Sequence, residues 1–498
     1  MSKSLRILEQ QSLDKADNIA LTVPAGGLSL TFGQLLELVH RTAESFQAAV
    51  ADWPVDRPVA LSFSNCPEFV VSFLALTWSG IPAMPLNPAL TADLTAESLS
   101  DEQPGALIVP PGESAMREAA ARTGVPCWTM GPDLRIEGLP GGDRTRNTEP
   151  GPETVALLLQ TSGTTGKPKW VPLTHENLLA SIGNITATYK LSPADSTLLV
   201  MPLFHVHGLV AALLSTLYSG GRVILPPRFS ASHFAEWAIA EKPTWYTAVP
   251  AIHQILLGHP EMRNIPGHQF RFIRSCSSFL PPDTMTQIEE LLGAPLLQAY
   301  GMTEASHQIA SNPLPPAERQ AESVGQATGV EVVILGPDGN ILPYGEQGEV
   351  AIRGNSVMNG YLDNPEANAG SFVDGFLRTG DLGQIDENGY IRLMGRIKEL
   401  INRGGEKIAP AQIDDVLLKV TGVEKAAAFG VPDTIYGESV HAAVVTRGSL
   451  TEEAILEHCR EKLPRFMVPV KIHIVAELPL GPSGKVSRIT LPKILGLA

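Results

Sequence analysis

The sequence predicts an α/β protein with a large amino-terminal domain and a small carboxyl-terminal α+β domain. Strand-like apolar runs alternate with helical patterns through about the first 300 residues, which is typical of parallel α/β layers. From about residue 323 to 396 short alternating strands follow, and beyond 396 helices and strands alternate again. Because 498 residues exceed what one core usually fills, we expect parallel α/β subdomains plus a small β-barrel-like unit in residues 1–396, and a second domain in residues 397–498.

The first elements carry ordinary helix and strand signals. Thr31-Phe-Gly-Gln34 reads as a capping box, and apolar residues at helical spacing continue from Leu35 to Phe46. Strands are expected at 59–63 and 81–86, and a helix at 68–78. The Pro/Gly-rich, charged stretch 139–153 predicts a surface linker between subdomains.

The middle of the chain predicts a second series of parallel strands. Helices are expected at 176–185 and 209–217, and strands at 198–204, 222–225, 244–249, 270–274 and 295–300. Ligands bind at the carboxyl ends of parallel strands. The expected strand exits are Thr161, His205, Ser275 and Gly301.

The last third predicts antiparallel strands and then a small α+β domain. Asp338-Gly339 and Asn388-Gly389 are hairpin turn signals. Beyond them, helices are expected at 411–420 and 451–463, and strands at 426–430, 441–446 and 471–475.

A glycine- and hydroxyl-rich loop follows the apolar run Leu157–Leu159. It reads Thr161-Ser162-Gly163-Thr164-Thr165-Gly166-Lys167-Pro168-Lys169. Glycines let backbone N–H groups close on oxygens, hydroxyls donate hydrogen bonds and lysines offset charge, so the loop suits a polyphosphate. It is not a Walker A loop, because only two residues separate its glycines and Pro168 follows the lysine. That spacing disfavours a P-loop kinase or ATPase.

Composition excludes several classes of protein. The net charge of -15 argues against general nucleic-acid binding. Four cysteines without a CxxC pair indicate neither a disulfide framework nor a zinc site. We expect no membrane span and a cytoplasmic protein, since the amino terminus lacks an apolar signal core and the chain ends in Gly-Leu-Ala rather than a Ser-Lys-Leu address.

The motifs together resemble the adenylate-forming (AMP-binding) superfamily, which includes acyl-CoA synthetases, luciferases and adenylation domains of peptide synthetases. They occur in order over nearly the whole chain: the phosphate loop, QAYGMTE at 298–304, RTGD at 378–381, GRIKE at 395–399 and PSGK at 482–485. The resemblance implies a ligase that adenylates a carboxylic acid with ATP and Mg²⁺ and transfers the acyl group to a thiol, usually that of coenzyme A. Isolated matches are weak, since Tyr-Gly is usually a core aromatic before a turn and Asp381 alone would be a turn residue.

The resemblance also implies roles for single residues in nucleotide binding. Thr161 to Lys169 would hold the β- and γ-phosphates, and Gln298, Ala299, Tyr300 and Gly301 would line the adenine, with Tyr300 stacking on it. Thr303 would meet the α-phosphate, Glu304 would ligate Mg²⁺, Asp381 would accept the ribose hydroxyls and Arg396 would support ribose or phosphate. Lys485 would bridge the acid and the α-phosphate.

Conformational roles follow from the same resemblance. Lys398 would be the hinge of a mobile carboxyl-terminal domain. Arg403-Gly404-Gly405-Glu406 would build a tunnel for pantetheine, the alternative being a Gly-Gly turn without function. His205 would gate the acid site, with His207 the weaker candidate, although a lone histidine in an apolar run is more often a core residue.

Within the superfamily the chain most resembles oxalyl-CoA synthetases (oxalate–CoA ligases). The likeness lies in MPLFHVHGLV, TWYTAVPAIHQI, RFIRSCSSFL, MTEASHQIASNPLP and GRIKELINRGGEKIAP. It implies that Ser277 and His307 contact the second carboxylate of oxalate, while Arg274 adds positive potential or is an ion-paired strand residue. An aliphatic pocket would leave that second charge unpaired.

Three alternatives remain open. The enzyme would act on other short or medium-chain acids, would load a carrier-protein thiol, or would be a catalytically silent relative. Trp170 departs from the superfamily pattern, which has glycine after the second lysine of the loop; its ring would tilt the next strand, reduce ATP turnover or pack outward. The superfamily occurs in peroxisomes and in cytosol, so the resemblance leaves the compartment open.

Overall fold

The computed structural model describes residues 5–24, 26–54, 56–140, 149–161, 169–263, 265–479 and 486–497. Two compact units emerge. The first contains the chain up to Thr161, Lys169–Val332 and Ile352–Gly375, and the second contains Val333–Ala351 and the chain from Phe376 on. The predicted domain boundary after residue 396 stays a prediction.

The first unit contains a seven-stranded sheet. Its order is β7(Ile136–Glu137), β6(Cys127–Met130), β5(Ala106–Val109), β3(Val59–Ser62), β4(Ala83–Leu86), β8(Val155–Thr161), β9(Lys169–Thr174). β8 and β9 pair antiparallel, with Thr161 opposite Lys169. The phosphate loop therefore connects two hydrogen-bonded strands, and its residues 162–168 lie outside the described residues.

The helices in the first part of this unit, α1 to α6, include several that begin at capping residues. α2(Phe32–Ala49) begins at the predicted capping box of Thr31 and Gln34, which is confirmed. α3(Pro67–Trp78) has proline at its first position, and α6(His175–Tyr189) carries a second capping box. The other helices of this half are α1(Ile7–Lys15), α4(Ala92–Glu102) and α5(Ser114–Thr123).

A nine-stranded sheet forms the rest of the core of the first unit. Its order is β16(Gln326–Ala327), β15(His307–Ser311), β14(Leu296–Met302), β13(Phe272–Ser275), β12(Trp245–Ala248), β10(Ser196–Leu198), β11(Arg222–Ile224), β1(Ile19–Thr22), β2(Ser29–Thr31). The strands from β14 to β1 are parallel, whereas β15, β16 and β2 are antiparallel to their neighbours.

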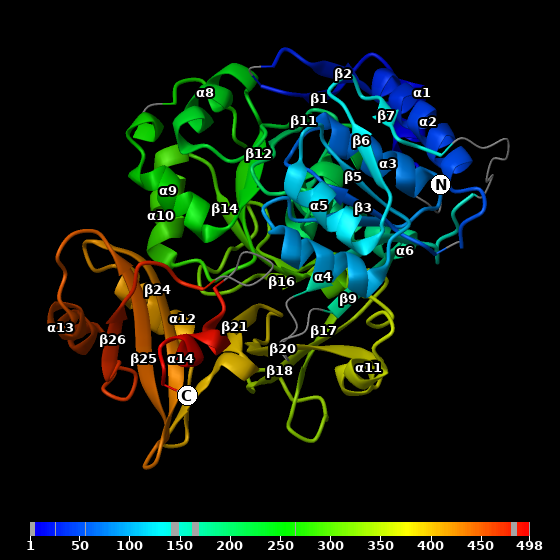
Figure 1. Cartoon of the computed structure of the whole chain (residues 1–498). Helices are drawn as coiled ribbons and strands as arrows, with labels where there is room; N and C mark the ends of the chain where they lie inside the picture. The colour runs from blue at the N-terminus through cyan, green and yellow to red at the C-terminus, as the bar shows by residue number, and fades with distance from the viewer. Residues whose placement is uncertain are drawn as a thin grey trace. The chain divides into compact units, whose positions relative to one another are not determined.

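Different helices cover the two faces of the nine-stranded sheet. One face carries α8(Ala231–Glu241), α9(Pro250–Gly258) and α10(Pro282–Leu292), which lie together in Figure 1 and share an apolar cluster with Tyr246 and Ile273. On the other face Tyr189 of α6 stacks on Phe272, and Phe272 stacks on Trp245. Since side chains alternate along a strand, Thr247 and Arg274 share this second face.

The strand predicted at 198–204 is wrong beyond Leu198, where β10 ends. Beyond Leu198 the Asn65 side chain donates to the Met201 carbonyl at 3.0 Å and accepts from the Leu203 amide at 2.9 Å. These bonds take the place of hydrogen bonds to a neighbouring strand. The predicted helix at 209–217 begins earlier, as a π-helical segment, η1(His207–Leu214), that continues into α7(Ser215–Tyr218). Short helical turns at η2(Pro260–Arg263) and η3(Thr303–Ala305), then α11(Pro365–Ser371) and β19(Phe372–Val373), complete the first unit.

The second unit holds two sheets. In one, β17(Glu331–Leu335), β18(Gly348–Arg353) and β20(Phe376–Ile385) are neighbours, and β21(Ile391–Arg396) pairs antiparallel with β20. In the other the order is β23(Glu406–Ile408), β22(Ile401–Arg403), β25(Gly437–Thr446), β24(Val423–Asp433), with β26(Lys471–Ile474) parallel to β25. α12(Pro410–Leu418) and α13(Glu452–Lys462) share an apolar cluster with this sheet. η4(Ile397–Glu399), η5(Arg488–Thr490) and α14(Leu491–Ile494) complete the unit.

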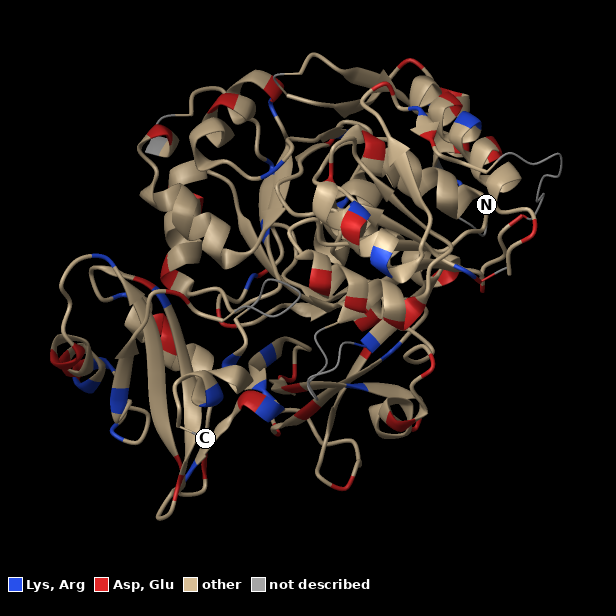
Figure 2. Cartoon of the chain, in the orientation of Figure 1, with Lys and Arg blue, Asp and Glu red and all other residues tan. Residues whose placement is uncertain are grey.

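The predicted α/β fold class is confirmed. Figure 2 shows more acidic than basic positions on the helices of the first unit, and α4, α8 and α10 contain acidic residues but no Lys or Arg. No helix in the part of the chain that the structure describes is long and apolar enough to span a bilayer.

Candidate active site

Predicted site residues meet where the parallel strands of the nine-stranded sheet end. β12 ends at Ala248, β13 at Ser275 and β14 at Met302. η1 begins at His207 and contacts β12 and β15. The carboxyl edge of a parallel sheet is where ligands bind, and Ser277, Tyr300, Thr303 and His307 all lie there.

The adenine-binding residues predicted on β14 are almost buried. Tyr300 is 7% exposed and Gln298 5%. The Gln298 Oε1 atom is buried without a hydrogen-bond partner among the described residues, so it can accept from a ligand amine. Gly301 permits a close backbone approach, because a Cβ there would lie 2.0 Å from the His307 carbonyl oxygen.

The surroundings of the Glu304 carboxylate suit the predicted role of magnesium ligand. Its side chain is 8% exposed, and no described Lys, Arg or His lies within ion-pair distance of it. Its Oε1 accepts the Tyr361 hydroxyl at 2.9 Å, and the Lys169 ammonium lies 4.4 Å from the centre of the Tyr361 ring. Tyr361 therefore links the last residue of the phosphate loop to the predicted metal ligand.

Ser277 and His307, the predicted acid-binding residues, form a polar cluster with His207 next to Gly301, called the acid cluster below. Ser277 Oγ lies 3.1 Å from His207 Nδ1, and the rings of His207 and His307 stack with centroids 5.1 Å apart. Ser277 and His307 have φ of +75° and +111°. Residues other than glycine rarely adopt such φ values, and strained backbone of this kind is common at functional sites.

Arg274 lies behind this cluster and is fully buried. Its donors bind Tyr189 Oη at 2.8 Å, Thr247 Oγ1 at 3.1 Å, Gln308 Oε1 at 3.1 Å and His207 Nε2 at 3.4 Å. No described carboxylate lies within ion-pair distance of this guanidinium. The ion-paired reading of Arg274 is therefore wrong for the described residues, and its positive charge remains behind the acid cluster.

His205 and His207 occupy different environments. His205 is half-buried, and its ring lies 4.6 Å from that of Phe204. His207 is 3% exposed and bonded to Thr247 and Ser277. The structure thus places His207, the weaker candidate from sequence, inside the cluster. The gating role of His205 stays a prediction.

In the second unit, Asp381 and Arg396 lie opposite each other on β20 and β21. Arg396 Nε is 2.9 Å from Asp381 Oδ1, and Arg396 also donates to the Thr379 carbonyl at 3.1 Å. Gly380 has φ +74°, which glycine adopts without strain. The ion pair fixes an almost buried carboxylate, as recognition of a ribose diol would need.

The other predicted site residues of the second unit that the structure describes lie in a short helical turn and in the β22–β23 hairpin. Lys398 lies in η4. Gly404 and Gly405 join β22 to β23 with φ of +62° and +94°, so the Gly-Gly turn has a structural reason of its own. Arg403 donates to the Phe466 carbonyl at 2.7 Å. Lys485 lies outside the described residues.

Trp170 packs into the core of the first unit rather than outward. It is 5% exposed, lies in an apolar cluster with Leu158, and donates its indole N–H to Asp101 at 2.8 Å. The Leu362 amide binds the Trp170 carbonyl at 3.0 Å.

Sequence reasoning missed Tyr361, Thr247, Gln308 and Tyr189 as part of this arrangement. Tyr361 follows Asn359-Gly360 in a segment without a recognised motif. Thr247 lies within a predicted strand, and its alternation with Tyr246 was the available signal for a polar residue on the site face.

Comparison with known proteins fits this geometry. A family model described as "AMP-binding enzyme" matches residues 8–362, and one described as "AMP-binding enzyme C-terminal domain" matches residues 412–485. The chain belongs to the AMP-binding enzyme family. It is an acid–CoA ligase of that family, and the predicted resemblance to adenylate-forming enzymes close to oxalate–CoA ligases is confirmed.

Individual relatives of this ligase cover nearly its whole length. An oxalate–CoA ligase from Arabidopsis thaliana is 44% identical over 97% of this chain and 96% of its own. A sulfoacetate–CoA ligase from Cupriavidus necator is 38% identical over 95% of this chain and 94% of its own. The crystal structure of ATP-bound MatB from Rhodopseudomonas palustris is 30% identical and superposes with a TM-score of 0.87 over 99% of each chain.

Proposed function

We propose that this ligase joins oxalate to coenzyme A through an oxalyl-adenylate, releasing AMP and diphosphate. The observation that carries the proposal is the acid cluster of Ser277, His207 and His307, in which Ser277 and His307 have strained backbone and the buried guanidinium of Arg274 lies behind. A small dianion needs hydrogen-bond donors and positive potential at its far end, whereas an aliphatic acid needs an apolar wall. The name of the Arabidopsis relative supports the same acid.

ATP, Mg²⁺ and coenzyme A are the reactants and cofactor of this chemistry. Tyr300, Gln298 and Gly301 take the adenine, and Asp381 with Arg396 takes the ribose. The loop Thr161–Lys169 takes the outer phosphates. Glu304, whose Oε1 accepts from the Tyr361 hydroxyl, would be the protein ligand of Mg²⁺, which would offset the charge that develops on the phosphate oxygens. Thr303 contacts the α-phosphate.

Acid and nucleotide must be held in line, because displacement at phosphorus depends on positioning and charge stabilisation. In the proposal the Lys485 ammonium bridges the attacking carboxylate and the α-phosphate, and domain rotation at Lys398 then exposes the adenylate to the thiol along Arg403 and Gly404. His205 shields the acid until that step.

A panel of acids tests the substrate assignment. Diphosphate release is measured with oxalate, sulfoacetate, malonate, acetate and hexanoate, each with and without coenzyme A. Oxalate should give the highest kcat/KM, and oxalyl-CoA should accumulate only with coenzyme A. Diphosphate release with other acids but none with oxalate would refute the substrate.

Lys485→Ala tests the chemistry. It should lower oxalate-dependent diphosphate release at least about 1,000-fold, because it removes the charge at the transition state. Thioester formation from separately prepared oxalyl-AMP should fall far less. An unchanged rate of adenylation would refute the role of Lys485.

Loading of a carrier protein is the second candidate from the same fold. It predicts adenylation of the acid without transfer to free coenzyme A. The arm of the panel that contains coenzyme A separates the two candidates directly.

A further inference from the structure

We propose that Arg274 directs a hydrogen-bond chain through Thr247 and His207 to Ser277, and that this chain makes the site selective for doubly charged acids. The four residues come from β13, β12, η1 and the segment after β13. Arg274, Thr247 and His207 are positioning residues, because they act on the substrate through Ser277. The inference rests on the proposed function and adds how the acid is selected.

The first step fixes the proton on His207. An Arg274 Nη1–H points at His207 Nε2 over 3.4 Å, and another bond from Nη1 reaches Thr247 Oγ1 over 3.1 Å. A guanidinium only donates, so Nε2 must present its lone pair. The Thr247 hydroxyl, 2.6 Å away, then donates to the same nitrogen. The ring is therefore the neutral tautomer with its proton on Nδ1.

The second step fixes the direction of Ser277. Because Nδ1 carries the proton, His207 donates to Ser277 Oγ over 3.1 Å. The hydroxyl of Ser277 therefore accepts from His207 and directs its own proton elsewhere. Ser277 is half-buried at the carboxyl edge of the sheet, so a ligand carboxylate there meets a donor rather than a lone pair.

The other donors of the Arg274 guanidinium also bind neutral groups. Arg274 Nε donates to Tyr189 Oη, and Nη2 donates to Gln308 Oε1. The Tyr189 hydroxyl in turn donates to Gln308 Oε1 over 3.0 Å and lies 2.8 Å from Ser311 Oγ, while Ser311 donates to the Asn312 carbonyl. All these partners are neutral. They hold the charged group in the core without cancelling its charge.

Selectivity follows from this arrangement. Two opposite unit charges about 10 Å apart in a protein interior attract each other strongly enough to change the affinity for a ligand roughly tenfold. Oxalate keeps a negative charge at its far end, whereas acetate has none there. The chain therefore favours oxalate over acetate through KM, while leaving the displacement step itself little changed.

Thr247→Val tests the chain with little change of volume. The KM for oxalate should rise at least about tenfold, while kcat for oxalate and kcat/KM for acetate each change less than about threefold. Thr247→Ser restores the hydroxyl and should bring the KM for oxalate back to within about threefold of wild type. Thr216→Val is the matched control, because it removes another buried hydroxyl, bonded to the Ala212 carbonyl, away from this cluster.

Two His207 variants keep the test decisive if Thr247→Val folds poorly. An asparagine amide lies near the position of Nδ1 and can still donate to Ser277, whereas a glutamine amide lies near Nε2. His207→Asn should therefore retain the preference for oxalate over acetate at least about fivefold better than His207→Gln. Equal losses for the two variants, or equal losses for oxalate and acetate in Thr247→Val, would overturn the chain.

A failure of the proposed function would be seen with the wild-type enzyme, which would release no diphosphate with oxalate. If the wild type then prefers another small dianion such as sulfoacetate, the same variants are compared with that acid and acetate. A wild type that prefers acetate to every dianion overturns both proposals.

Discussion

Two arginines three residues apart, Arg271 and Arg274, show how the two edges of the nine-stranded sheet differ. Both contact Tyr189: Arg271 donates to its backbone carbonyl at 2.9 Å and Arg274 to its hydroxyl at 2.8 Å. Arg271, at the amino end of β13, lies 3.0 Å from the carboxylate of Asp195. Arg274, near the carboxyl end, is bonded only to neutral groups among the described residues.

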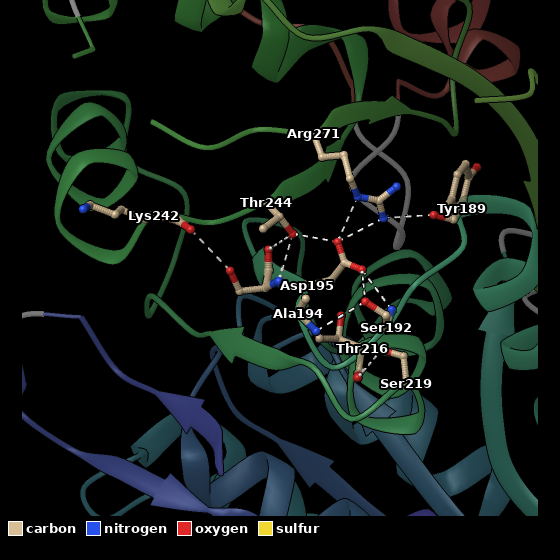
Figure 3. Close-up of polar contacts among 10 residues, drawn as sticks. Tyr189, Ser192, Ala194, Asp195, Thr216, Ser219, Lys242, Thr244 and Arg271 are labelled. Atoms are coloured by element: carbon tan, nitrogen blue, oxygen red, sulfur yellow. Dashed lines mark hydrogen bonds and ion pairs between the residues drawn. The ribbon is translucent and has the colours of Figure 1, made fainter. Parts of the chain in front are cut away.

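Figure 3 shows the pairing at the amino edge. Asp195 is 5% exposed and accepts from the Ser192 amide and hydroxyl, from Thr244 Oγ1 and from Arg271 Nε. These bonds tie the starts of β10, β12 and β13 together. The comparison teaches that a buried charge with a full set of partners holds the fold, whereas one without a counter-charge is available to a ligand at the edge where ligands bind.

The largest expected effect is on stability, from Asp195→Ala. The change leaves Arg271 without its partner and removes acceptors from Ser192 and Thr244. Loss of one member of a buried pair costs about 3–5 kcal/mol, and we expect about 3 kcal/mol because Arg271 is partly exposed. Urea unfolding measures the loss. Exposed Glu261→Ala is the control, expected within about 0.5 kcal/mol of wild type.

The same variant also tests the division between the edges. Folded Asp195→Ala enzyme should keep the wild-type ratio of kcat/KM for oxalate to that for acetate. A changed ratio would mean that the amino edge also contributes to selection of the acid.

Arg274→Met should give the opposite result. It removes the charge and keeps an apolar side chain of similar length. Replacing a buried ion pair by hydrophobic residues is often neutral for stability. Because the partners of Arg274 are neutral, its loss leaves no unpaired charge, and Tyr189 stays bonded to Gln308, so we expect a loss below about 2 kcal/mol. The oxalate-to-acetate ratio should fall about 50-fold, which is about 2.3 kcal/mol of differential binding. Equal losses with both acids would remove the distinction between the two arginines.

Sequence reasoning reached the strands and motifs but not these pairings. It placed a strand at 270–274, against 272–275 in the structure, and it located Ser277 and His307 from the resemblance. Local patterns could not reveal the partners, because Tyr189 lies 85 residues before Arg274 and Gln308 lies 34 after it.

Contacts between residues distant in sequence also explain why His205 and His207 differ in burial and why β10 is shorter than predicted. His205 and His207 differ because η1 starts at His207, and β10 stops at Leu198 because Asn65, distant in sequence, binds the chain beyond it. Both results depend on tertiary contacts. The site residues assigned from the resemblance in the phosphate loop, and Lys485, lie outside the described residues.

A third prediction compares His207 with His253 on the opposite face of β12. His253 Nδ1 lies 3.1 Å from the hydroxyl of Tyr246, the neighbour of Thr247. Burial lowers the pKa of His253 to about 3. The unfolded chain therefore takes up this proton below about pH 6.5 while the native protein does not, so stability falls as the pH decreases. The loss from this histidine should be about 2 kcal/mol between pH 6.5 and pH 5.

Urea unfolding at several pH values checks this dependence. The double variant His253→Phe/Tyr246→Phe removes the titrating group together with its hydroxyl partner, and should lose about 2 kcal/mol less than wild type over that interval. Tyr246→Phe alone keeps the histidine and should retain the wild-type pH slope. If the double variant has the wild-type slope, His253 is not the buried neutral group that we compare with His207.

The smallest expected effect comes from Arg271→Lys, which separates charge from geometry at the amino edge. A lysine keeps a positive charge for Asp195, but its single ammonium cannot reproduce the fork of donors that reaches both Asp195 and the Tyr189 carbonyl. It also loses the guanidinium that lies 4.9 Å from the Phe272 ring centre. We expect a loss of about 1 kcal/mol in urea unfolding, the net value of one hydrogen bond, with no change in acid preference. A loss as large as that of Asp195→Ala would show that geometry rather than charge holds this edge, and the contrast with Arg274 would then concern hydrogen-bond fit instead of pairing.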